Sequence, residues 1–178
     1  MSAHKPLRSW RVPILLGLTI LVGLAATYSR TRPRPGCGGS TVLNQATGLE
    51  TSVNCFFSDY GYLPGNKERL KTDGPDGIMS LRVLLGMERS GNPLNTREVK
   101  YLIAKEGKID RGGLIYTKAG DDITGLYDSW GNPYVVLLDT DNDGTLAFRW
   151  GDHLVELKGR RAAVFTPGED HKEAPRTM

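Results

Sequence analysis

The stretch from Asp128 to Gly144 constrains the fold more tightly than any other part of the chain. After Asp128 and Ser129 it contains Trp130-Gly131-Asn132-Pro133-Tyr134, continues as an apolar run over residues 135–138, and ends in alternating aspartates and a glycine. Glycine, asparagine and proline favour tight turns, whereas β-branched residues favour strands. We therefore predict a turn, a strand and a second turn, with the Trp130 ring covering the sheet.

The distribution of charged residues along the chain is more informative than the net charge. The 178 residues carry a formal net charge of +3, and residues 1–36 hold six basic residues and no acidic one. The remaining residues carry 17 of the 23 basic residues against all 20 acidic ones, so this part is mildly acidic. Such a body has no basic surface for a phosphate backbone, and we expect no nucleic-acid binding.

Residues 12–28 form an uncharged, almost wholly apolar segment after a basic N-terminus, residues 1–11. A helix of this length spans roughly 25 Å, near the thickness of a bilayer core, and Trp10 and Tyr28 lie where interfacial aromatic residues belong. A secretory signal cleaved near Gly23 and Ala25 is the alternative. We expect a transmembrane helix in the lipid bilayer. It would make the chain a single-pass inner membrane protein whose body is periplasmic or otherwise extracytoplasmic.

Residues 29–39 are a linker by composition, because two prolines forbid a continuous helix and the glycines that follow restore flexibility. The linker holds one of the two cysteines, Cys37, and the other is Cys55. In an oxidising compartment the two could form a disulfide. The alternative is an exposed thiol and a second cysteine buried on a helix.

The globular domain, residues 40–166, is predicted to be α+β. An amphipathic helix capped by Ser40 or Thr41 runs to about Asp59, with apolar residues at three- and four-residue steps. A short helix from Ile78 ends near Gly86, and Asn95-Thr-Arg-Glu98 predicts a third helix. Residues 66–77 read as turn-rich, and residues 112–125 as loop with one short strand. Antiparallel strands follow at 134–139, 145–150, 154–157 and 162–165, before a flexible tail, residues 167–178.

The second turn contains a candidate metal site at Asp139, Asp141 and Asp143. Carboxylates two residues apart around a glycine match the first half of a calcium loop, although the twelfth position of that pattern is Trp150 instead of a bidentate glutamate. Calcium is therefore the cofactor that this sequence suggests. The alternative is a hairpin in which Asn142-Asp143-Gly144 supplies positive φ and the aspartates are solvated. Nucleophile elbows, phosphate loops and zinc-protease motifs are missing from the sequence, so we do not expect an enzyme.

Four stretches together resemble the pseudopilins of type II secretion, and type IV pilin-like proteins more broadly. They are the helix exit at residues 56–64, the segment 125–134 with Trp-Gly-Asn-Pro-Tyr, the turn 139–144, and the final strand region 161–170. The resemblance implies an N-terminal membrane helix and an amphipathic helix packed on a small antiparallel sheet. The chain departs from the family pattern at Val22, where the leader has glutamate, and at Pro33 and Pro35, which interrupt the long helix.

The resemblance implies a membrane-anchored structural or assembly protein of a type II secretion or type IV pilus-like system, involved in protein transport. Its expected partners are other pseudopilin-like subunits or secreted cargo. The departures leave a second hypothesis open, a tethered extracytoplasmic binding module that keeps the fold without assembling. An envelope hydrolase is a third hypothesis, which would need a cleft around residues 139–143.

Overall fold

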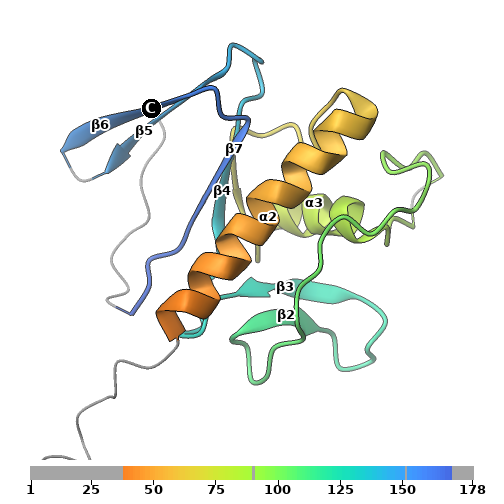
Figure 1. The fold of residues 1–178 in the computed structure, drawn as a ribbon. Coiled ribbons are helices and arrows are strands. Elements are labelled where there is room, and N and C mark those ends of the chain that lie inside the picture. The colour runs from red at the N-terminus through yellow and green to blue at the C-terminus, as the bar shows by residue number, and fades with distance from the viewer. Residues whose placement is uncertain (1–37, 90, 151, 170–178) are drawn as a thin grey trace, which may run out of the picture. The chain divides into compact units, whose positions relative to one another are not determined.

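The computed structural model describes residues 38–89, 91–150 and 152–169 (Figure 1). The predicted transmembrane segment 12–28, most of the linker and residues 170–178 of the tail lie outside these ranges. No helix within them is long and apolar enough to cross a membrane. The elements confirm an α+β class, with helices on a small antiparallel sheet.

The first described helix, α2 (Gly38–Tyr60), confirms the predicted amphipathic helix and begins slightly earlier than expected. It buries one stripe, at Leu49, Val53 and Phe56, while Leu43, an apolar residue nearer the start of the helix, is 66 % exposed. The helix ends at Gly61, whose φ of 77° is in the left-handed region that glycine adopts without steric cost. Its predicted end and its buried face were therefore largely readable from the sequence.

Three strands form the central sheet in the order β1 (Arg69–Lys71), β4 (Val135–Leu138), β7 (Ala162–Phe165), all antiparallel. The side chains of β4 alternate between two apolar clusters. Val136 and Leu138 join the cluster that contains the α2 stripe, and Val135 and Leu137 join a second cluster. The hairpin of β5 (Thr145–Trp150) and β6 (His153–Lys158) supplies that second cluster. Because β4 is covered on both faces, its sequence is a continuous apolar run.

The second described helix, α3 (Pro75–Leu85), begins three residues before the predicted start and ends as predicted at Gly86. Proline at its first position needs no backbone partner there, and the N–H groups of residues 86 and 87 cap the carbonyls of Val83 and Arg82. The helix packs very closely on β1, because a Cβ built at Gly77 would lie 1.9 Å from the Lys71 carbonyl oxygen.

Two strands were missed by the sequence analysis. The segment expected to be turn-rich contains β1, and the segment expected to be mostly loop is a hairpin of β2 (Gly113–Tyr116) and β3 (Ile123–Tyr127). Thr72 joins these regions, because its buried hydroxyl donates to the Leu126 carbonyl at 2.6 Å and accepts from the Tyr134 N–H at 2.9 Å. These elements are held by distant partners, so no local pattern marks them.

The predicted helix at Asn95–Glu98 is wrong. The Asn95 side chain is buried and bonds the carbonyls of Val83 and Val99 instead of capping a helix, and Glu98 has a φ of 52°. Tertiary contacts therefore override the local helix-start pattern, and Asn95 holds a loop in place instead of starting a helix. The start of the predicted tail is also held in place, because the Asn132 side-chain amide donates to the Gly168 carbonyl at 2.8 Å.

Candidate functional site

The Trp130–Tyr134 segment is a structural turn organised by a buried carboxylate. Asp128 Oδ1 accepts the N–H groups of Trp130 and Asn132, each at 2.8 Å, and Oδ2 accepts the Asn132 side-chain amide and the Thr166 hydroxyl. Gly131 has a φ of 93°, and Trp130 packs against the main core, as predicted. Because Asp128 is fully buried and every bond is internal, this segment shapes the fold.

Tyr134, the last residue of this turn, is completely buried against α2. Its hydroxyl donates to Gln45 Oε1 at 2.9 Å, and burial raises its pKa well above the ordinary value. Pro133, next to it, pairs with Tyr127 in an isolated antiparallel bridge. These contacts attach the turn to the helix and to β3.

The structure brings the three predicted metal ligands together. Carboxylate oxygens of Asp139, Asp141 and Asp143 all lie within 4.8 Å of one another at the end of β4. Asp139 is buried, and its oxygens accept the N–H groups of Asp143 at 3.1 Å and Gly144 at 3.0 Å. Asn142, which precedes Asp143, has a φ of 59°, so the predicted positive φ of this turn is confirmed. The turn does not close a hairpin, because β4 pairs with β1 and β7 whereas β5 pairs with β6.

Burial and the neighbouring acids raise the pKa of Asp139. Desolvation is the largest cause, followed by the side-chain hydrogen bond with Asp141, while the backbone N–H groups of Asp143 and Gly144 act in the opposite direction. A hard cation among these oxygens would relieve the repulsion, and the donor set suits calcium. The same groups also explain a cation-free turn, since the hydrogen bonds from the Asp143 and Gly144 N–H groups to Asp139 stabilise the turn by themselves.

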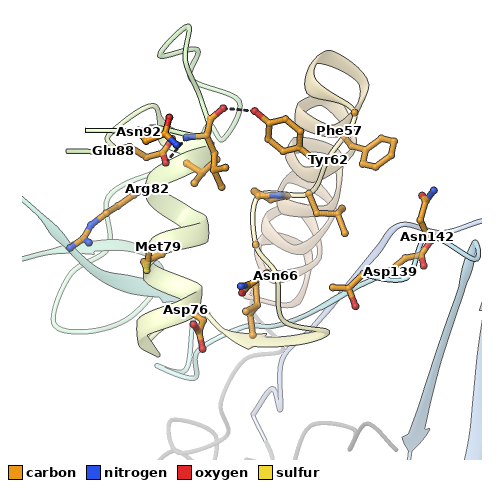
Figure 2. A pocket seen from close by; sticks show the side chains of 18 of the residues that line it. Phe57, Tyr62, Asn66, Asp76, Met79, Arg82, Glu88, Asn92, Asp139 and Asn142 are labelled. Atoms are coloured by element: carbon orange, nitrogen blue, oxygen red, sulfur yellow. Dashed lines mark hydrogen bonds between the residues drawn. The ribbon is translucent and has the colours of Figure 1, made fainter. Parts of the chain in front are cut away.

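Next to this turn lies an open groove with a volume of about 900 Å³. Its walls come from the end of α2 and the loop after it, from the outer face of α3, and from Glu88, Arg89, Asn92 and Leu94 (Figure 2). Asp139 and Asn142 lie at one end, and Glu88 and Asn92 lie at the other (Figure 2). The groove therefore adjoins the acidic cluster, although the sequence analysis located only the cluster.

Apolar side chains in the groove are open to solvent. Met79 is 63 % exposed, and Tyr62 and Leu94 are each 41 % exposed. The Tyr62 hydroxyl donates to the Leu94 carbonyl at 2.8 Å, which holds its ring in place across the groove (Figure 2). Exposed apolar residues gathered in a concave surface, with polar groups around them, are typical of a site that receives a partner.

The two arginines that line the groove are each held by an aspartate. Arg82 makes a two-point ion pair with Asp122, Nε to Oδ1 at 2.9 Å, and its guanidinium extends away from Tyr62 (Figure 2). This pair lowers the pKa of Asp122, with the Arg82 hydrogen bond as the main cause. Arg89 approaches Asp121 with Nη1 and Oδ2 at 3.8 Å. The cationic charge in the groove is therefore largely neutralised.

The geometry of α2 disfavours the predicted disulfide. Cys37 lies outside the described residues, and Cys55 is a free, exposed thiol on α2. Gly38 and Cys55 are 17 residues apart in one helix, about 25 Å along its axis, whereas the two Cα atoms of a disulfide lie within about 7 Å. Cys55 thus agrees with the free-thiol alternative, but it is exposed and not buried.

Comparisons with known proteins gave no match: no protein-family model, no curated protein and no solved structure matches the chain.

Proposed function

We propose that this chain is a membrane-anchored structural protein of pseudopilin type, whose folded domain assembles with other copies through α2. The observation that carries the proposal is the outward face of this helix. Its exposed residues between Gly39 and Ser58 include no charged side chain: Gly39, Ser40, Leu43, Asn44, Thr47, Thr51, Asn54, Cys55 and Ser58.

An uncharged helix face is unusual on a surface that meets only water. Of the two acids of α2, Glu50 is turned to the sheet, where it accepts the Val164 N–H at 2.9 Å, and Asp59, exposed in the last turn, pairs with Arg97 at 3.0 Å. Small and uncharged side chains allow two helices to approach closely, and they remove the desolvation cost of buried charges. The helix, the sheet and the preceding apolar segment 12–28 also occur in the order that the pseudopilin resemblance implies.

Cysteine cross-linking of the full chain in its native membranes tests the proposal. In a Cys37→Ser background, we expect a bismaleimide to join copies through Cys55, and through cysteine placed at Thr51 or Thr47 in a Cys55→Ser chain. Glu156→Cys on β6, also exposed, is the matched control and should give monomer. Monomer at all three helix positions, or equal cross-linking at position 156, would refute assembly through α2.

The groove favours a second candidate, a tethered binding module that does not assemble. In that case the native protein would remain a monomer with an intact N-terminus, and the groove would hold a different protein. Intact-mass and N-terminal sequencing of the membrane-extracted chain separates the two, because pilin-type processing would shorten and methylate the N-terminus.

A further inference from the structure

The groove beside α3 carries negative charge that no basic side chain of the described residues neutralises. Asp76, on the first turn of α3, and Glu88, at the far end, have no ion-pair partner among the described residues, whereas both lining arginines do. The Glu88 oxygens accept the N–H groups of Leu94 and Asn95, which holds the carboxylate in place but leaves its charge without a basic partner. At the opposite end, the Arg161 guanidinium stacks on the Phe57 ring at 3.9 Å. Its single positive charge is smaller than the combined negative charge of the three carboxylates at Asp139, Asp141 and Asp143. A partner for this groove should therefore be basic.

The apolar lining adds a second requirement. Tyr62, Met79 and Leu94 present exposed surface between the acidic positions, and the partly exposed Phe57 extends it. Extended, proline-containing segments suit aromatic-lined grooves, because their backbone loses little entropy on binding. The partner should therefore combine basic residues with prolines.

We propose that the groove binds the segment Arg30–Pro35 of a second copy of this chain. That segment reads Arg-Thr-Arg-Pro-Arg-Pro, with three arginines, two prolines and no acid. The sequence after Gly168 continues as Glu-Asp-His-Lys-Glu, so it matches the acidic groove less well. The inference rests on the proposed function, since it names a contact that assembly would use.

Chain length keeps the Pro35 end of this segment far from Phe57 of its own copy. Two residues, 36 and 37, link Pro35 to Gly38, and the three Cα-to-Cα steps span at most about 11 Å. Gly38 and Phe57 are 19 residues apart in α2, about 28 Å along the helix. A segment that meets the groove of a second copy makes a head-to-tail contact, and such contacts extend into open assemblies instead of closing as dimers.

Binding of a synthetic peptide tests the proposal. The receptor is the full chain in zwitterionic lipid nanodiscs, with Arg30, Arg32 and Arg34 changed to Gln so that its own segment does not compete. The probe is a fluorescein-labelled peptide of residues 29–36, titrated by anisotropy. We expect saturable binding that weakens with added salt, and that Asp76→Lys or Met79→Lys weakens roughly tenfold.

The matched controls lie on β6, away from the groove. Glu156→Lys and Leu154→Lys change an exposed acid and an exposed apolar residue in the same way and should leave the affinity unchanged. The absence of saturable binding would overturn the proposal, as would equal weakening by the β6 variants, which would indicate unspecific attraction of arginine. A photoreactive residue at position 33 should in addition cross-link to residues 61–66 or 76–94 of a second copy, and exclusive cross-linking to another protein would overturn it.

The outcomes separate this inference from the proposed function. Cross-links along α2 without peptide binding would keep assembly and reject the groove contact. Peptide binding without α2 cross-links would support the affinity of the groove for Arg30–Pro35 and reject assembly through the helix.

Discussion

Replacing Gly77 by alanine should destabilise the domain, although alanine is the better helix former. The residue lies inside α3, where Gly→Ala ordinarily gains about 1 kcal/mol of stability. Here the new Cβ would lie 1.9 Å from the Lys71 carbonyl oxygen and 2.6 Å from its carbon, whereas ordinary contact begins near 3.4 Å. The obstacle is backbone of β1, so it cannot rotate away.

The size of the destabilisation follows from the distance by which α3 must move away from β1. Moving the new methyl from 1.9 to 3.4 Å requires a shift of 1.5 Å. Such a gap removes much of the dispersion contact of Leu81 and Leu84, which are almost fully buried under this helix. Overpacking of this kind costs about 1–3 kcal/mol or more, and with the lost contacts we expect a net loss of about 3 kcal/mol.

Gly48→Ala is the matched control within α2, because a Cβ added at this position would have no atom within 4 Å outside its own helix backbone and chain neighbours. It should gain about 0.5–1 kcal/mol. Urea unfolding of the full chain in nonionic detergent, followed by circular dichroism, gives both values from the midpoint and slope. If Gly77→Ala were as stable as the parent while Gly48→Ala gained stability, the close approach of α3 to β1 would be wrong.

Three further predictions concern Thr72, the acidic turn and the ion pair of α3. Thr72→Val should cost about 2–4 kcal/mol in urea unfolding, because it leaves the Leu126 carbonyl and the Tyr134 N–H unpaired, and Thr72→Ser, which keeps the hydroxyl, should lose far less. If calcium binds the aspartate turn, a tenfold excess over Kd should stabilise the fold by about 1.4 kcal/mol, and Asp141→Asn should remove this gain; a melting temperature unmoved by calcium or chelator would reject the site. The lowered pKa of Asp122 means that its pairing stabilises the fold above the ordinary aspartate pKa of about 3.9 and loses that effect as the pH falls through the folded-state value. The stability difference between the parent and Arg82→Gln should therefore shrink on acidification, and a constant difference across the pH series would contradict the assignment.

The local sequence pattern was sufficient to predict those elements that are determined by their own residues. The apolar steps of α2, the turn glycine at its end and the apolar run of β4 are each visible in a short window of sequence. The strands β5, β6 and β7 were predicted to within a residue at each end. The turn after β4 was also predicted, because aspartate, asparagine and glycine have strong intrinsic turn preferences.

Other features depend on partners far along the chain. The strand β1 has only three residues, and it exists because β4 pairs with it some 66 residues later. The pattern at Asn95 predicts a helix, yet the Asn95 side-chain amide donates to the carbonyls of Val83 and Val99 and so holds a loop in place. The groove is lined by residues of α2 and α3, by Glu88, Arg89, Asn92 and Leu94, and by the end of β4, so no short window of sequence contains it.

The sequence by itself determined the main helix, four strands and the composition of the acidic turn, because periodicity and turn chemistry act between near neighbours. The tertiary structure decided which carboxylates line one groove, which arginines are neutralised and where apolar residues remain open to solvent. Those properties depend on distances between residues separated by tens of positions. They emerge only when the helices are packed on the sheet, and the proposed contact between copies rests on them.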